Sequence, residues 1–145
     1  MSQVHNKPPG RWTLTLPNDV QHVPQLSMFV EDICTAINLD EMTMLQMNLA
    51  IEEAVVNVMS YAYPEGVNGH VDIEVTATDE WLTFVITDTG KPFDPTKSAE
   101  VDITLSAEER RIGGLGIHLV RRLMDDIQYE YVDGHNILTL RKKRE

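Results

Sequence analysis

The chain has 145 residues, 42% of them hydrophobic, and a single cysteine, Cys34. This length suits one globular domain over residues 1–145, and one cysteine excludes a disulfide framework and a multi-cysteine zinc site. No apolar run approaches the roughly 20 residues that cross a bilayer, so no membrane segment is predicted, and the lone cysteine fits the reducing cytoplasm.

Acidic residues dominate the charge and are unevenly distributed. The net charge is −11, and between Trp12 and Gly90 there are 13 acidic residues and no Lys or Arg. Nucleic-acid binding needs Lys and Arg that contact the phosphates, so no direct nucleic-acid binding is predicted. The acidic stretch suits a basic protein partner or a divalent cation, and a solvated acidic surface is the alternative.

The first part of the chain predicts a strand and two helices. Apolar residues alternate with threonine over 12–16, which predicts a strand. Apolar residues recur at helical spacing over 21–38, and Asp40 is placed to cap a second helix that extends to about Ala62.

The second part predicts a long loop, a helix and four strands. Residues 91–112 have no periodicity, and loops of this length inside a domain are usually functional. A helix follows from near Gly116, and the basic run 141–144 is predicted to be a solvated tail. Alternation predicts strands over 71–75, 82–86, 128–132 and 137–141. This order predicts an α+β two-layer sandwich, with helices on one face of a mostly antiparallel sheet.

Two polar residues interrupt the apolar pattern of the second helix. Glu53 and Asn57 are four residues apart, so their side chains lie on the same side of the helix. The amide oxygen of Asn57 suits Mg²⁺, and a carboxylate such as Glu53 can orient or deprotonate a nucleophile. Taken alone, such a pair is more often a solvated helix surface than a site.

Two further segments carry residues typical of ligand binding. Asp88-Thr89-Gly90 follows a predicted strand, where an acidic side chain can recognise the amino group of a base; an ordinary turn is the alternative. Gly113-Gly114-Leu115-Gly116 opens a predicted helix after Arg110 and Arg111, and such backbone presents N–H groups to phosphate. A glycine-rich hinge explains the second segment equally well.

Taken together and in order, these motifs resemble the GHKL (histidine-kinase-like) ATPase family. The resemblance is closest to the RsbW-like anti-sigma-factor serine/threonine kinases and covers roughly residues 12–143. It rests on LAIEEAVVNVMSYAYPEG, ITDTGKPFDP, RRIGGLGIHLVRRLMDDIQYE and DGHNILTLRKKR. The resemblance implies a Bergerat-type ATP-binding fold, with residues 94–112 as the ATP lid.

The resemblance also implies roles for individual residues. Glu53 is expected to be the general base, and Asn57 to coordinate Mg²⁺. Asp88 is expected to bind the adenine amino group, with Gly90 allowing close approach. The expected nucleotide-binding residues are Asn57, Asp88, Gly90, Arg111, Gly113, Gly114, Leu115, Gly116 and Thr139.

The function that the resemblance implies is an ATP- and Mg²⁺-dependent serine/threonine-protein kinase that is also an anti-sigma factor. Such a protein phosphorylates a STAS-domain anti-anti-sigma protein and sequesters a sigma factor, in a partner-switching system that regulates transcription. A homodimer paired through the first strand and helix is also implied. The alternatives are a nucleotide-gated binding module without phosphotransfer and a stand-alone ATPase. Glu53 favours the kinase over the binding module, because a module needs no base.

Overall fold

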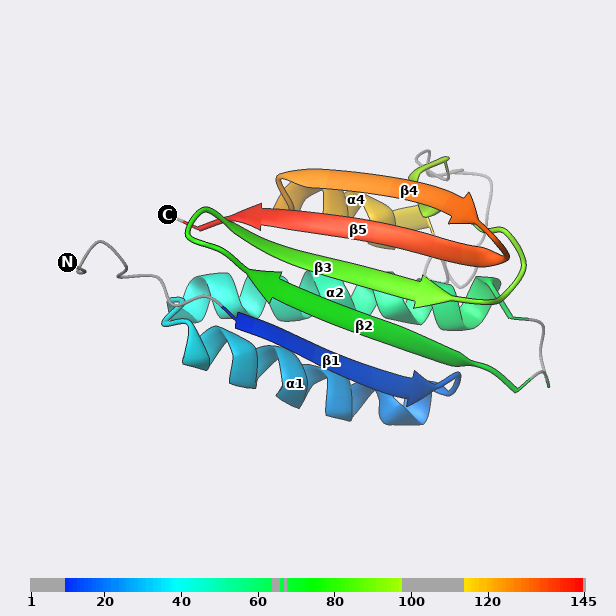
Figure 1. The fold of residues 1–145 in the computed structure, drawn as a ribbon, viewed down its shortest axis with the longest axis horizontal. Helices are drawn as coiled ribbons and strands as arrows, with labels where there is room; N and C mark the ends of the chain where they lie inside the picture. Colours follow the sequence, from blue (N-terminus) through cyan, green and yellow to red (C-terminus); the bar gives the residue numbers. More distant parts are fainter. Residues whose placement is uncertain (1–9, 64–65, 67, 98–113, 145) are drawn as a thin grey trace.

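The computed structural model describes residues 10–63, 66, 68–97 and 114–144. Along the chain, these residues form a strand, two long helices, two strands, a further helix and a final pair of strands (Figure 1). The strands are β1 (Gly10–Pro17), β2 (His70–Ala77), β3 (Trp81–Asp88), β4 (Asp126–Val132) and β5 (His135–Lys143). The helices are α1 (Val23–Ala36), α2 (Glu41–Tyr61) and α4 (Gly114–Leu123), with short 3₁₀ turns η1 (Val20–His22) and η2 (Pro95–Lys97).

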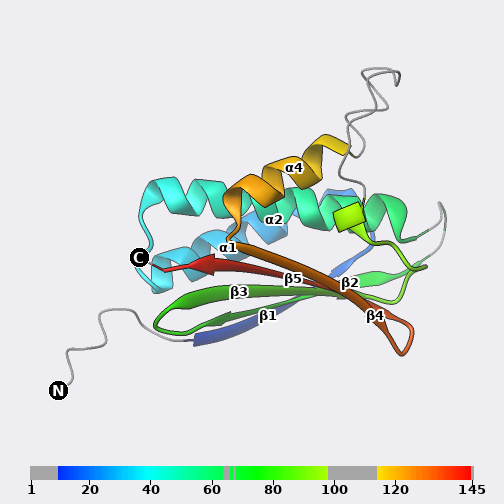
Figure 2. The same cartoon turned by 90° about the horizontal axis from the view of Figure 1, so that it is seen from above.

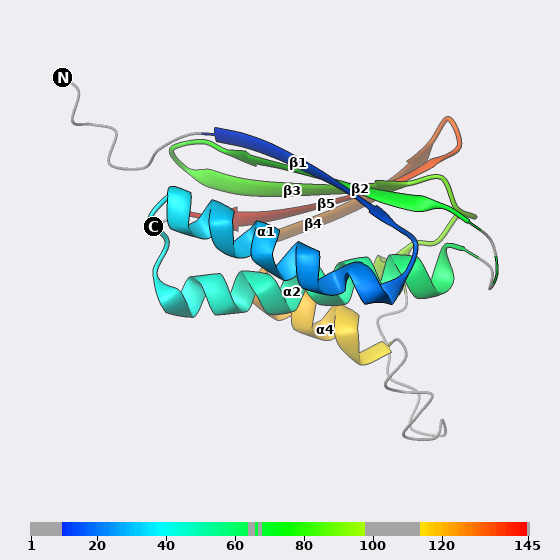
Figure 3. The same cartoon turned by 90° about the horizontal axis from the view of Figure 1, so that it is seen from below.

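The strands form one five-stranded sheet in the order β1-β2-β3-β5-β4, and every neighbouring pair is antiparallel. The three helices lie together on one face of this sheet, and the opposite face carries no helix of the described residues (Figure 2). Seen from the helical side, α2 lies between α1 and α4 (Figure 3). The predicted α+β two-layer sandwich is confirmed.

The core lies between the sheet and the helices, because each strand presents alternate residues to the helical layer. On β3 the buried residues are Leu82, Phe84, Ile86 and Asp88. The same period that buries three apolar side chains therefore buries a carboxylate at the end of the strand. Asp88 is one of four polar or charged residues that are buried in the described part of the chain.

The helix ends follow capping chemistry. The Asp40 side chain accepts a hydrogen bond from the Thr43 backbone N–H at 3.0 Å, so α2 begins where the sequence predicts. The first helix begins later than predicted, because Asp19 caps the turn η1 and α1 starts at Val23.

No helix of the described residues is long and apolar enough to cross a membrane.

The prediction of a solvated tail over residues 141–144 is wrong. Residues 141–143 complete β5, and Arg144 is only 5% exposed. The Arg144 backbone N–H donates to the Glu80 carbonyl at 2.8 Å, and its guanidinium donates to the carbonyls of Thr78 and Ile37. Three backbone carbonyls therefore bind this basic residue at the edge of the core.

Candidate functional site

The carboxylate of Asp88 is the centre of the candidate site. Its side chain is 2% exposed, and Oδ1 accepts hydrogen bonds from the Gly90 backbone N–H at 2.8 Å and from Asn136 Nδ2 at 2.9 Å. The second oxygen, Oδ2, is buried and has no hydrogen-bond donor among the described residues. A buried acceptor without a donor is costly, so this oxygen is suited to a ligand that brings its own N–H group.

Burial raises the pKa of Asp88 above its usual value, and the hydrogen bonds from Asn136 and Gly90 act in the opposite direction. Desolvation is the larger effect because the side chain is removed from water in a mostly apolar layer. The ionised carboxylate is therefore less stable in the folded chain than in water. A ligand N–H group directed at Oδ2 would offset part of that cost.

Asn136 also belongs to the candidate site, although the residues predicted from the sequence do not include it. It is 4% exposed and lies directly opposite Asp88 in the β3–β5 pair. Its amide donates to Asp88 and to the Lys91 carbonyl at 2.8 Å, and its oxygen accepts from the Phe93 backbone N–H and the Tyr129 hydroxyl. The alternating pattern of the sequence could have indicated this residue, because Asn136 occupies the same alternate positions as Leu138 and Leu140. The predicted strand, however, began one residue after Asn136.

Gly90 joins the Asp88 loop to the C-terminal end of α2. A Cβ atom at Gly90 would lie 2.3 Å from the Ala62 carbonyl oxygen, which no real contact permits. The next residue, Lys91, donates its backbone N–H to the same carbonyl at 2.7 Å. Glycine is therefore required here for packing against α2, in addition to the ligand approach that the sequence suggested.

The two polar residues of α2 occupy different environments. Asn57 is 6% exposed, whereas Glu53 is half-buried. Burial, and secondarily the neighbouring charge of Glu52, raises the pKa of Glu53. One turn after Asn57, Tyr61 stacks on Phe93 with ring centroids 5.4 Å apart. Through this stacking, α2, which carries Glu53 and Asn57, contacts the loop that follows Asp88.

Part of the predicted phosphate-binding segment belongs to α4. Gly114, Leu115 and Gly116 are the first three residues of this helix, which packs against α2. The N-terminal end of α4 lies toward the C-terminal part of α2 (Figures 2 and 3). Backbone N–H groups at such an end favour anions. The predicted residues Arg111 and Gly113, and most of the predicted lid over 94–112, lie outside the described residues.

The expectation for Thr139 is corrected by the strand register. Thr139 alternates with the buried Leu138 and Leu140, and it pairs with Val85 of β3. Its side chain therefore projects from the face of the sheet that the helices do not cover. Asp88 and Asn136 project from the other face, so Thr139 does not join them.

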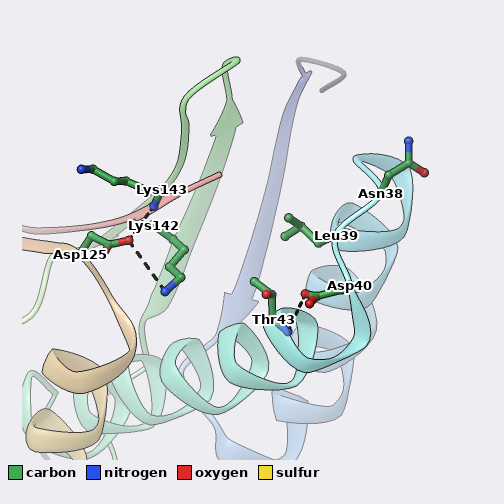
Figure 4. Close-up of a pocket in the computed structure, with 7 residues that line it drawn as sticks. All are labelled: Asn38, Leu39, Asp40, Thr43, Asp125, Lys142 and Lys143. Carbon is green, nitrogen blue, oxygen red and sulfur yellow. Dashed lines mark hydrogen bonds and ion pairs between the residues drawn. The ribbon is translucent and has the colours of Figure 1, made fainter. Parts of the chain in front are cut away.

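A cavity lies at the opposite end of the sheet from Asp88, where Lys143 pairs with Trp81. It has a volume of 440 Å³ and lies between the start of α2 and the end of β5 (Figure 4). Three of its charged groups have partners, because Lys142 pairs with Asp125 at 3.8 Å and Asp40 caps α2. Asp125 also accepts the backbone N–H of Lys143 at 2.7 Å. These contacts give Asp40, Asp125 and Lys142 structural roles at this end of the sheet.

Residues 16–142 match the family described as histidine kinase-like ATPase domain. The chain belongs to this family. The serine-protein kinase RsbW of Listeria monocytogenes serovar 1/2a is 28% identical over 142 residues, which are 95% of this chain and 88% of that protein. The serine/threonine-protein kinase BtrW of Bordetella bronchiseptica is 30% identical over 94 residues, 65% of this chain and 66% of that one. The predicted resemblance to RsbW-like kinases is confirmed.

Two solved structures are similar to the chain in fold. The crystal structure of the RsbU and RsbW domains of Rv1364c from Mycobacterium tuberculosis matches with a TM-score of 0.66 and 16% identity, covering 95% of this chain. The chain spans 33% of that larger protein. The SiaB–SiaC complex from Pseudomonas aeruginosa matches with a TM-score of 0.56 and 15% identity, over 92% of this chain and 89% of that one. At these identities the likeness concerns the fold.

Proposed function

We propose that this chain is an ATP-dependent serine/threonine-protein kinase and anti-sigma factor. In this proposal it phosphorylates a STAS-domain anti-anti-sigma protein and sequesters a sigma factor in a partner-switching system. The proposed nucleotide site is supported by the Oδ2 atom of Asp88, which is buried and has no hydrogen-bond donor among the described residues. The exocyclic amino group of adenine supplies such a donor, whereas the carbonyl at the same position of guanine does not.

The proposed roles of the other residues follow from their positions. Asn57 is the proposed protein ligand of Mg²⁺, and no three His, Cys, Asp or Glu residues of the described chain form a metal cluster. A magnesium ion held by one amide oxygen takes its remaining ligands from phosphates and water, which is how Mg²⁺ is commonly bound with nucleotides. The N-terminal end of α4, with Arg111 and Gly113 before it, is the proposed phosphate-binding segment.

Glu53 is the proposed general base. It lies one turn before Asn57 on the same side of α2, so a metal-bound γ-phosphate would lie beside it. The raised pKa of Glu53 supports this role, since a base with a pKa closer to the working pH accepts a proton more effectively. The proposed domain is 1–145 with an ATP lid over 94–112, and the proposed assembly is a homodimer.

The test is a phosphorylation assay with the full chain, Mg-ATP and the STAS-domain protein from the same genome. The expected product is phosphoserine or phosphothreonine on the STAS protein, detected by mass spectrometry. Binding of both proteins and of ATP without any transferred phosphate would instead establish a nucleotide-gated binding module.

A further inference from the structure

The outer side of α2 carries an apolar stripe that the hydrophobic core does not use. Met42, Leu45 and Leu49 are separated by three and four residues, so their side chains share one side of the helix. They are 61%, 55% and 46% exposed. Other residues of α2 face the sheet and are buried: Met47, Ala50, Ile51, Ala54, Val55 and Val58. A helix that packs on a sheet needs only one apolar side, so folding does not account for this α2 stripe.

Within α1 and α2, the charged side chains near the α2 stripe are all acidic. Residues 23–61, which include α1 and α2, contain no Lys or Arg. The acidic residues of this segment are Glu31, Asp32, Asp40, Glu41, Glu52 and Glu53. Glu31 accepts a hydrogen bond from Asn48 of α2, and Glu52 accepts one from Ser27 of α1 at 2.6 Å. These bonds place carboxylates along the seam between α1 and α2, beside the stripe.

This charge pattern selects among possible occupants of the surface. A second copy docked through the same stripe would bring two acidic surfaces together, and an anionic membrane surface would be repelled in the same way. A helix with an apolar stripe flanked by Lys and Arg would bury the three side chains and pair its charges with the carboxylates.

We propose that the α2 stripe is a docking surface for a basic amphipathic helix of a partner protein. Glu53 lies one turn after Leu49 on the same side of α2, so a helix docked along the stripe brings its protein next to the proposed base. The inference rests on the proposed function in one respect, namely that this chain acts on another protein. Docking itself requires neither nucleotide nor phosphotransfer.

The test uses a fluorescent helical peptide of about 18 residues, five turns, with leucine along one side and lysine elsewhere. Its binding to the full chain without nucleotide is measured by fluorescence anisotropy. The double variant Leu45→Ser/Leu49→Ser is expected to weaken binding by about tenfold or more, because it removes the apolar centre of the contact. The matched control is Tyr131→Ser/Val132→Ser, which alters two residues of β4 that are 44% and 42% exposed. It is expected to leave the affinity unchanged.

A second peptide, with glutamate in place of lysine, is expected not to bind. Equal binding of the two peptides, or unchanged affinity of Leu45→Ser/Leu49→Ser, would overturn the inference. A change from dimer to monomer in that variant, measured by light scattering, would also overturn it, since the stripe would then join two copies. Peptide binding without kinase activity would leave the docking surface intact and remove only the proposed kinase.

Discussion

Asp88 of β3 and Asn136 of β5 face each other across an antiparallel strand pair, with Asn136 Nδ2 2.9 Å from Asp88 Oδ1. The same amide also binds the Lys91 carbonyl and the Phe93 backbone N–H. One buried side chain therefore fixes both the carboxylate and the loop that follows it. The orientation of the second Asp88 oxygen is set before any ligand arrives.

Replacing Asn136 should damage both folding and nucleotide binding. Asn136→Ala leaves the part-buried Lys91 carbonyl and Phe93 N–H without this partner, and the loss of such a partner costs about 1–3 kcal/mol. We expect a loss of free energy of unfolding in that range, measured by urea denaturation, and weaker ATP binding. The control is Thr139→Ala on the same strand, whose side chain lies on the other face of the sheet. Its ATP affinity should be unchanged, and a large loss there would contradict the site described above.

Asp88→Asn should stabilise the nucleotide-free protein while weakening nucleotide binding. Because burial raises the pKa of Asp88, the folded state holds the proton more tightly than the unfolded state. The contribution of Asp88 to the free energy of unfolding therefore decreases as the pH rises from the usual pKa of aspartate through the raised pKa. Melting temperatures should show the greatest advantage of the variant at neutral pH and a smaller one in acid.

The nucleotide affinity of Asp88→Asn should fall by about ten- to a hundredfold, because a charge-assisted hydrogen bond is lost. Calorimetric titration with ADP measures this change. An ADP affinity equal to that of the wild type would refute the adenine role of Asp88.

Gly90→Ala should destabilise the fold through one backbone contact. The added Cβ would lie 2.3 Å from the Ala62 carbonyl oxygen, so the loop or the end of α2 must shift. Such overpacking typically costs about 1–3 kcal/mol in free energy of unfolding. The control is Gly134→Asn in the turn between β4 and β5, where nothing lies within 4 Å and asparagine tolerates the positive φ. Denaturation midpoints of both variants give the comparison, and equal midpoints would rule out this contact as the reason for glycine.

Cys34 should be chemically inert in the folded chain. Its side chain is 1% exposed, and burial, with the nearby charge of Glu31, raises the pKa of the thiol to about 11. The thiolate is the reactive form, so little of it exists at pH 8. Reaction with a disulfide reagent at that pH should be slow in the native protein and fast in concentrated urea. Rapid labelling of the native protein would show that α1 opens readily.

The sequence predicted most of the fold because its periodicities are strong. The alternation over 82–86 locates β3 and therefore places Asp88 at a strand end, and the Asp40 cap locates the start of α2. The role of Asn136 was not predicted, because it depends on a hydrogen bond to Asp88, which is 48 residues away in the sequence. The burial of Arg144 was not predicted for a similar reason. A run of basic residues suggests a solvent-exposed segment, and only the assembled fold brings three backbone carbonyls to Arg144.

Glu53 is proposed to accept the proton of a serine or threonine hydroxyl while Mg-ATP donates its phosphate. Glu53→Gln retains the size of the side chain and removes its basicity. A control titration should show that this variant binds Mg-ATP and the STAS protein with nearly wild-type affinity. Asn57→Ala, by contrast, should weaken Mg-nucleotide binding as well as transfer.

The decisive measurement is the single-turnover rate of phosphate transfer to the STAS-domain protein, compared between the wild type and Glu53→Gln at saturating Mg-ATP. A general base typically contributes about 10²–10⁴-fold to the rate, so the variant should be slower by a factor in this range. A variant that transfers phosphate at the wild-type rate would contradict the assignment of Glu53 as the base.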